Sequence, residues 1–442
     1  MKPPLETFPL ATATLGVART PLEDRANWRA LDGLRGWAIL FVIAVHLWAH
    51  SSRTGTGLPL SVHIGTKIID VTWVFATGHN AVVVFFVLSG FLLYKHWLER
   101  QETITLRAQI ISFVQSRARR ILPAYFFYLA LYMLLVAIVG KHRYGADLRA
   151  WNFFLNFVFL SPIANVLPTI KPVVTSLDVV PGTWSLNAEM WFYAAMPLLA
   201  VLLSRLMSIR WSAWLLLIAA LAGPLVRTMM GSNPDWILRY SVFGVFDSFL
   251  IGMATAAFFN GYTFHRRWSW LFPLGLVWYV FICAGKSFPL LDYQFQLAVV
   301  SGMMILGLIV APGSLWRASL ERNWIVNIGH WSYGLFLSNI LICWYVILPI
   351  SQALKIQSGA QLLALNFFLG IPIMIVLARA TYIGFEYACI RRTRPNLRKA
   401  IIQVGFVSCS LVAASLVFSV LALTRSGDPE FNVPLSFWLH AK

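Results

Sequence analysis

The stretch at residues 31–50, LDGLRGWAILFVIAVHLWAH, is an apolar run long enough to cross a bilayer, and it carries two ionisable side chains. Arg35 lies near its start and His46 follows eleven residues later. At about 100° per residue the two return to within roughly 20° of the same helix face, about 16 Å apart along the axis. Ionisable groups inside a membrane span are costly and by default face the protein interior at functional sites. The stretch therefore predicts a transmembrane helix with a cation and a histidine on its inner face.

The composition indicates a polytopic membrane protein. Of the 442 residues, 59% are hydrophobic and 12% charged, whereas soluble domains average about 25% charged residues. The net charge of +18 comes from basic clusters between apolar segments, a pattern typical of topology control and anion binding; a nucleic-acid partner is not expected. The four cysteines are dispersed without a CxxC motif or a Cys/His cluster, so neither a metal site nor a disulfide framework is predicted.

Eleven apolar segments are predicted to span the membrane, with Pro123 opening the third. They lie at residues 31–50, 71–97, 123–140, 183–204, 211–229, 240–259, 268–284, 295–311, 331–350, 361–385 and 400–423. Residues 151–163 form an apolar segment too short to cross, which predicts an interfacial or re-entrant piece.

The distribution of charge predicts the orientation and the domain organisation. Lys and Arg are more numerous in alternate loops, which favours a cytoplasmic N-terminus. We expect a cytoplasmic tail at residues 1–30 and a membrane domain at 31–392. An extra transmembrane helix with a basic linker at 393–424 and a short extracytoplasmic tail at 425–442 follow.

Three arginines, Arg117, Arg119 and Arg120, precede Pro123 at the start of the third predicted span. Such a cluster is usually a positive-inside signal. It also suits a phosphate clamp, because guanidinium groups contact phosphate oxygens in a bidentate way. Both interpretations stay open at this point.

His46 and Glu189 are the candidate acid–base residues, and each also has a structural interpretation. A histidine near neutral pKa suits the removal of a proton from a hydroxyl nucleophile, but a lone histidine is as often an interhelical hydrogen-bond partner. Glu189 lies in an apolar, aromatic segment. It either pins two helices together as a hydrogen-bonded acid or orients the histidine as a triad carboxylate does.

Other polar residues in the apolar segments favour structural roles. Ser89-Gly90 is most simply a close-packing position. Arg239 and Asp247, eight residues apart, offer either an internal polar site or an ion pair, whereas Arg379 and Glu386, seven apart and nearly in line, favour a structural pair.

Five motifs together resemble the acyltransferase-3 family of integral-membrane O-acyltransferases. They are LDGLRG with its Arg35–His46 spacing, FFVLSGFLLY at 85–94, RRILPAY at 119–125, WSLNAEMWFY at 184–193 and WSYGLFLSN at 331–339. They occur in the family's order over roughly residues 29–392. The resemblance implies an all-α fold, with a ten-helix acyltransferase core plus one extra C-terminal transmembrane helix.

The resemblance also implies roles for individual residues. His46 is expected to act as the catalytic base, and Glu189 stands at the glutamate of the family's SLxxE pattern. Substrate or donor contacts are expected from Arg35, Arg117, Arg119, Arg120, Trp184, Ser185, Tyr193 and Asn339. Asn339 is a departure, because the family commonly has histidine there and asparagine cannot take a proton at neutral pH.

The function expected from the resemblance is acyl transfer, with acetyl-CoA as co-substrate and no permanently bound cofactor. The acceptor would be a hydroxyl of a cell-surface or exported polysaccharide or of its lipid-linked precursor, in a bacterial inner membrane. Membrane lipids are further partners, and self-association into a homo-oligomer stays open. A secondary transporter or glycolipid exporter is the alternative, although no internal repeat supports it, and a non-catalytic scaffold is a third hypothesis.

Overall fold

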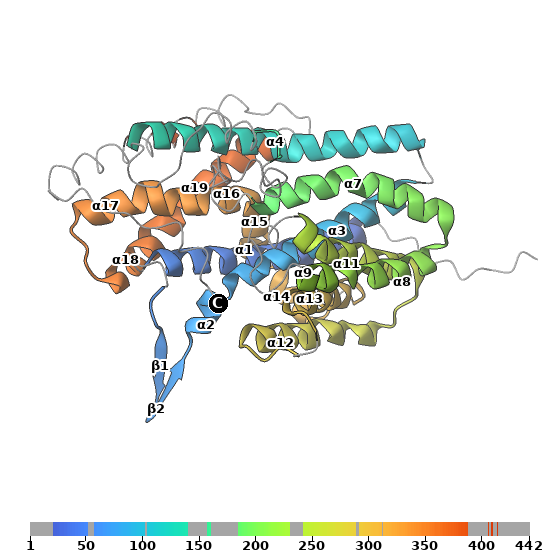
Figure 1. Ribbon diagram of the computed structural model, residues 1–442, viewed down its shortest axis with the longest axis horizontal. Coiled ribbons are helices and arrows are strands. Elements are labelled where there is room, and N and C mark those ends of the chain that lie inside the picture. The colour runs from blue at the N-terminus through green and yellow to red at the C-terminus, as the bar shows by residue number, and fades with distance from the viewer. Residues whose placement is uncertain are drawn as a thin grey trace, which may run out of the picture.

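The computed structural model is a bundle of long helices that run roughly along one axis, with a β-hairpin projecting from it (Figure 1). It describes residues 21–51, 57–101, 104–139, 157–160, 184–229, 242–288, 291–311 and 313–387, and in addition residues 405, 408, 409 and 413.

The first half of the described chain contains four of the helices that line the cavity described below. In order, the elements are α1 (Pro21–His50), β1 (Ser61–Ile64), β2 (Lys67–Asp70), α2 (Thr72–Ala76), the 3-10 turn η1 (Gly78–Asn80), α3 (Ala81–Arg100), α4 (Leu106–Val139), α7 (Trp184–Leu206), α8 (Ile209–Ala220) and α9 (Ala222–Met229). The antiparallel hairpin β1–β2 lies between the first two predicted spans.

The second half alternates long helices with short ones. Its elements are α11 (Val242–Gly261), η3 (Arg266–Trp270), α12 (Leu271–Cys283), α13 (Tyr293–Ile309), α14 (Leu315–Leu320), α15 (Asn323–His330), α16 (Ser332–Ile342), η4 (Cys343–Ile347), α17 (Leu348–Ala353), α18 (Gly359–Leu365), η5 (Asn366–Gly370), α19 (Ile371–Thr381) and η6 (Tyr382–Tyr387). The segments η4, η5 and η6 are π-helical turns.

The chain is an all-α polytopic membrane protein, as the sequence predicts. A helix lies at each of the first ten predicted segments, and in the described residues eight helices are long and apolar enough to cross a membrane. The helices α12 and α13 are shorter, with 13 and 17 residues. The eleventh predicted span and the C-terminal tail lie outside the described residues, apart from four isolated positions. The predicted interfacial segment also lies outside them, apart from 157–160.

Two predicted helix starts are corrected. Pro123 does not open a helix but lies inside α4, which begins at Leu106. A proline inside a helix removes one backbone hydrogen bond and often bends the helix. The sequence predicted the first turn of a helix, where proline costs no intrahelical hydrogen bond. Similarly, α1 begins at Pro21, ten residues before the apolar stretch, so the last part of the expected tail is helical.

Close contact between α3 and α11 forms the centre of the bundle. A Cβ atom on Gly90 of α3 would lie 2.2 Å from the carbonyl oxygen of Phe249, and one on Gly252 would lie 2.1 Å from that of Val87. Backbone atoms occupy both positions, so only glycine allows the two helices to approach this closely. The close-packing interpretation of Ser89-Gly90 is therefore confirmed at Gly90.

The glycines of LDGLRG bring the short helices α14 and α15 against α1. A Cβ atom on Gly33 would lie 1.9 Å from the carbonyl oxygen of Leu320, and one on Gly36 would lie 2.2 Å from that of Ile325. On the other side of the contact, a Cβ on Gly329 would lie 1.8 Å from the carbonyl oxygen of Asp32. This contact fixes the backbone on both sides of Arg35.

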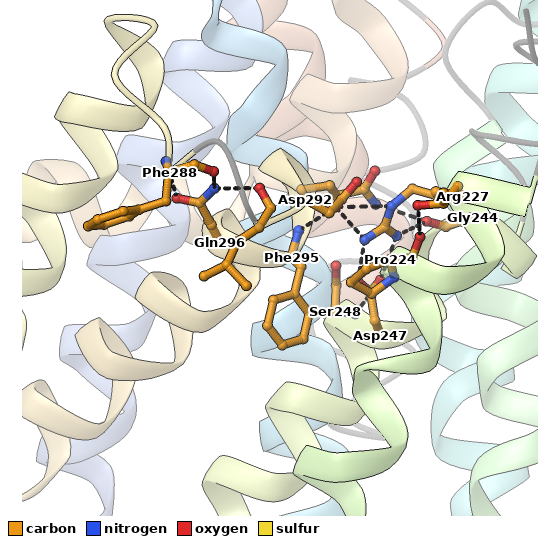
Figure 2. Close-up of polar contacts among 12 residues, drawn as sticks. Pro224, Arg227, Gly244, Asp247, Ser248, Phe288, Asp292, Phe295 and Gln296 are labelled. Carbon is orange, nitrogen blue, oxygen red and sulfur yellow. Dashed lines mark hydrogen bonds and ion pairs between the residues drawn. The ribbon is translucent and has the colours of Figure 1, made fainter. Parts of the chain in front are cut away.

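A buried ion-pair network joins α9, α11 and the start of α13. Figure 2 shows Arg227 between two carboxylates: Nη1 and Nη2 donate to Asp247 at 3.1 and 2.7 Å, and Nε and Nη2 donate to Oδ1 of Asp292 at 3.1 and 2.6 Å. Nη1 also donates to the carbonyl oxygen of Gly244. Asp247 thus pairs with Arg227, whereas the predicted partner, Arg239, lies outside the described residues.

Candidate active site

A cavity of about 320 Å³ lies between α1, α3, α4, α7 and α16. Its size is at the lower end of the range of ligand-binding pockets. Apolar side chains form much of its wall. The polar residues that line it are Asp32, Arg35, Ser89, His96, Arg117, Arg120, Ser185, Glu189, Tyr193, Ser332 and Tyr333. The cavity therefore combines an apolar wall with several cationic groups, which suits an anionic ligand that has an apolar part.

Three arginines from two helices line this cavity. Arg35 comes from α1, and Arg117 and Arg120 come from α4. The two arginines of α4 are three residues apart and share a helix face, whereas Arg119 lies about 160° from Arg117 and does not line the cavity. The three arginines of the predicted cluster therefore lie on different faces of α4. Two of them can contact a ligand in the cavity, and the third cannot.

Arg35 is held in place by an acidic residue one turn earlier in α1. Its Nη1 lies 3.6 Å from Oδ1 of Asp32, one turn earlier. The other oxygen of Asp32 lies 3.1 Å from Nε2 of His330 in α15, and the His330 ring stacks on Tyr382 at 6.0 Å between centroids. Sequence reasoning missed Asp32 and His330. The spacing of three between Asp32 and Arg35 was the available signal.

Glu189 accepts two hydroxyl hydrogen bonds in the cavity. Ser89 Oγ donates to Glu189 Oε1 at 2.7 Å, and the Tyr193 hydroxyl donates to the same oxygen. Glu189 also interacts electrostatically with Arg35 and Arg120. The contact with Ser89 joins α7 to α3, which fits the interpretation of Glu189 as a hydrogen-bonded group between two helices, and a role of Glu189 in orienting His46 stays a prediction. Ser89, which the sequence assigned to packing, joins the polar lining.

His46 contacts Asn339 of α16. His46 Nδ1 lies 2.6 Å from Asn339 Oδ1, while Asn339 Nδ2 donates to the carbonyl oxygens of Leu335 and Phe336 at 3.1 and 2.7 Å. Because its nitrogen is held by two carbonyls, the Asn339 side chain presents its oxygen to the imidazole. His46 Nδ1 must then carry the proton, and the lone pair is on Nε2. A histidine in this tautomer can accept a proton at Nε2.

The His46–Asn339 pair does not line the cavity but adjoins one of its lining residues. Phe336 lines the cavity, and its carbonyl oxygen accepts the hydrogen bond from Asn339. Arg35 and His46 therefore both face the protein interior, as the sequence predicts. Arg35 contacts the cavity, and His46 lies deeper along α1.

Of the remaining residues predicted to contact substrate or donor, some line the cavity and one does not. Ser185 and Tyr193 line the cavity, whereas Trp184 does not and instead meets Phe86 edge-on at 6.0 Å between ring centroids.

The predicted pair of Arg379 and Glu386 does not form. Arg379 lies over the Trp331 ring, and Oε1 of the buried Glu386 has no hydrogen-bond partner.

A comparison with family models assigns the chain to a family. The family model described as "Acyltransferase domain", of the acyltransferase-3 family, matches residues 28–383. The chain belongs to the acyltransferase-3 family. The matched range contains the arginine-lined cavity, Glu189 and the His46–Asn339 pair. No curated protein and no solved structure matches the chain.

Family membership identifies the protein as a membrane acyltransferase. This assignment favours transfer chemistry over the transporter and scaffold hypotheses. Within the family, the chain keeps the arginine–histidine spacing of α1 and has asparagine at position 339. In the described residues no group of three or more His, Cys, Asp and Glu side chains is arranged to hold a metal ion.

Proposed function

We propose that the protein transfers an acetyl group from acetyl-CoA to a hydroxyl of a cell-surface or exported polysaccharide, or of its lipid-linked precursor. The observation that carries the proposal is that the His46–Asn339 pair adjoins Phe336, which lines the same cavity as the three arginines. An anionic donor needs the arginines, a neutral hydroxyl acceptor needs the histidine, and the reaction needs the two groups close together.

The arginine-lined cavity supports an acyl-CoA donor. Guanidinium groups bind phosphate oxygens through charge-assisted, bidentate hydrogen bonds, and Arg35, Arg117 and Arg120 converge from two helices. The apolar side chains of the same cavity, such as Phe86 and Phe336, suit the uncharged part of the donor. In this arrangement the phosphates lie near the arginines and the thioester points toward His46.

His46 is the base in the proposed reaction. Its Nε2 removes the proton of the acceptor hydroxyl as the oxygen attacks the thioester carbonyl. The C–S bond then breaks, and the imidazolium returns the proton to the leaving sulfur, so that free CoA and an ester form. A thioester is already activated, so positioning and proton transfer supply most of what the reaction needs. Transfer through a carrier residue remains the alternative to this direct path.

The proposed orientation places the arginine end of α1 toward the cytoplasm, where acyl-CoA is made. The acceptor then reaches His46 from the opposite side of the bilayer. The excess of basic residues in the loops on the same side as the N-terminus supports this orientation.

The test is acetyl transfer by the purified, full-length protein in proteoliposomes. The substrates are radiolabelled acetyl-CoA and glycan extract from the source cells, freed of esters by mild alkali. We expect His46→Ala to lower the rate by about 10²- to 10⁴-fold, the usual contribution of a general base, with acetyl-CoA binding unchanged. His63→Ala, in the exposed hairpin, is the matched control. Wild-type rates in His46→Ala protein would exclude the catalytic assignment.

A further inference from the structure

His50 and Asn366 form a second histidine–asparagine pair, one turn beyond His46. His50 lies four residues after His46, which is roughly 40° around α1 and about 6 Å further along its axis. Asn366 Nδ2 donates to His50 Nδ1 at 3.0 Å. Both pairs therefore lie on the inner side of α1, and His50 is the one farther from Arg35.

The second pair leaves one donor and one acceptor unsatisfied. Since an amide nitrogen only donates, His50 Nδ1 accepts and the ring proton is on Nε2. His50 Nε2 and Asn366 Oδ1 are both buried without a hydrogen-bond partner, and the two residues are 8% and 0% exposed. Most buried polar groups are paired, so such atoms call for an explanation. The hydroxyl groups of a sugar, which both accept and donate, are their chemical complement.

The backbone around His50 is unusual at the residues that contact it. Asn366 is the first residue of the π-helical turn η5. Trp344, whose ring lies edge-on to His50 at 5.4 Å between centroids, belongs to the π-helical turn η4. Such turns are rare and occur frequently at functional sites. This observation is independent of the unsatisfied atoms and concerns the same residues.

The two histidines have opposite tautomers. His46 donates through Nδ1 to Asn339 and has its lone pair on Nε2, whereas His50 accepts at Nδ1 and has its proton on Nε2. The inner side of α1 thus presents a proton acceptor followed, one turn later, by a hydrogen-bond donor.

We propose that His50 and Asn366 form an acceptor subsite, which binds two further hydroxyls of the sugar whose hydroxyl His46 activates. This inference rests on the proposed function. His50 Nε2 donates to the oxygen of one of these hydroxyls, and the other hydroxyl donates to Asn366 Oδ1. The arginine cavity lies at the other end of α1, so the subsite is on the acceptor side of His46.

The test is the dependence of acetyl transfer on acceptor concentration in proteoliposomes. Acetyl-CoA is kept saturating and the de-esterified glycan extract of the source cells is titrated. We expect His50→Phe and Asn366→Leu to raise the apparent KM for the extract about tenfold, the effect of losing a hydrogen bond to a buried site. The kcat should change less than about threefold, and acetyl-CoA binding should stay at the wild-type value. His50→Gln, which restores an N–H donor, should recover part of the affinity.

The matched control is Ser351→Ala. Ser351 is buried in the neighbouring helix α17, and its hydroxyl already donates to the carbonyl oxygen of Leu348 at 2.7 Å, so its loss should leave the KM for the extract unchanged. A wild-type KM in folded Asn366→Leu and His50→Phe proteins would overturn the subsite and leave a structural pair. Absence of transfer by the wild-type protein would overturn the proposed function, and the subsite with it.

Discussion

The imidazole of His46 in α1 donates from Nδ1 to the side-chain oxygen of Asn339 in α16 over 2.6 Å. The contact joins residues 293 positions apart and fixes the tautomer of the proposed base. In a serine-protease triad an aspartate orients the histidine in the same way. Here a neutral amide oxygen does so, because the amide nitrogen is held by two carbonyl groups of its own helix.

Replacing Asn339 tests this orientation. We expect Asn339→Leu to lower the rate of acetyl transfer by at least about tenfold, because His46 loses the acceptor that keeps its lone pair on Nε2. Asn339→Asp retains an acceptor oxygen at the same position and should keep most of the activity. Initial rates at saturating acetyl-CoA measure both variants. Equal rates for Asn339→Leu and the wild-type protein would contradict the assignment.

Replacing single arginines tests the donor site. Arg120→Gln and Arg35→Gln should weaken acetyl-CoA binding about 10- to 100-fold, the value of hydrogen bonds to charged groups. Arg119→Gln is the matched control, since Arg119 belongs to the same cluster but does not line the cavity. Equilibrium binding to the detergent-purified protein is the measurement. Wild-type affinity should also fall with added salt. An equal loss in all three variants would indicate a general charge effect and no phosphate site.

Glu189→Gln separates a charge role from a structural one. Glu189 lies among the arginines of the cavity and interacts electrostatically with Arg35. Removing its negative charge reduces repulsion of a bound phosphate, so acetyl-CoA binding should be unchanged or tighter. Turnover should fall, because the hydroxyls of Ser89 and Tyr193 lose their charged acceptor. Binding and kcat are measured on the same preparation. Weaker acetyl-CoA binding in Glu189→Gln would refute this role.

The network in Figure 2 predicts a stability effect without a direct catalytic one. Arg227→Met leaves Asp247, which is 0% exposed, without its cation. Breaking a buried ion pair on one side costs about 3–5 kcal/mol of unfolding free energy. The expected result is a lower Tm in detergent, with normal acetyl transfer per folded molecule at low temperature. The exposed Arg210→Met serves as control. An unchanged Tm for Arg227→Met would show that the network does not stabilise the bundle.

The sequence predicted local features well. A helix lies at each of the first ten predicted apolar segments, and helical periodicity correctly placed Arg35 and His46 on the interior side of α1. Both features depend only on neighbouring residues and on the cost of exposing polar groups to lipid. The prediction for Pro123 failed because a proline is compatible with a helix start and with a bend, and sequence alone does not distinguish them.

Which residues meet across the bundle was decided only by the tertiary structure. The sequence offered Glu189 as a candidate partner of His46, whereas the packing of α1 against α16 gives His46 an amide. The packing of α3 against α7 gives Glu189 the hydroxyl of Ser89, beside that of Tyr193 from its own helix. The pairing of His50 with Asn366 likewise depends on how α1 meets the π-helical turn η5. Residue types and spacing determine what each helix face offers, whereas the close approach of helices hundreds of residues apart decides which groups are within hydrogen-bond distance.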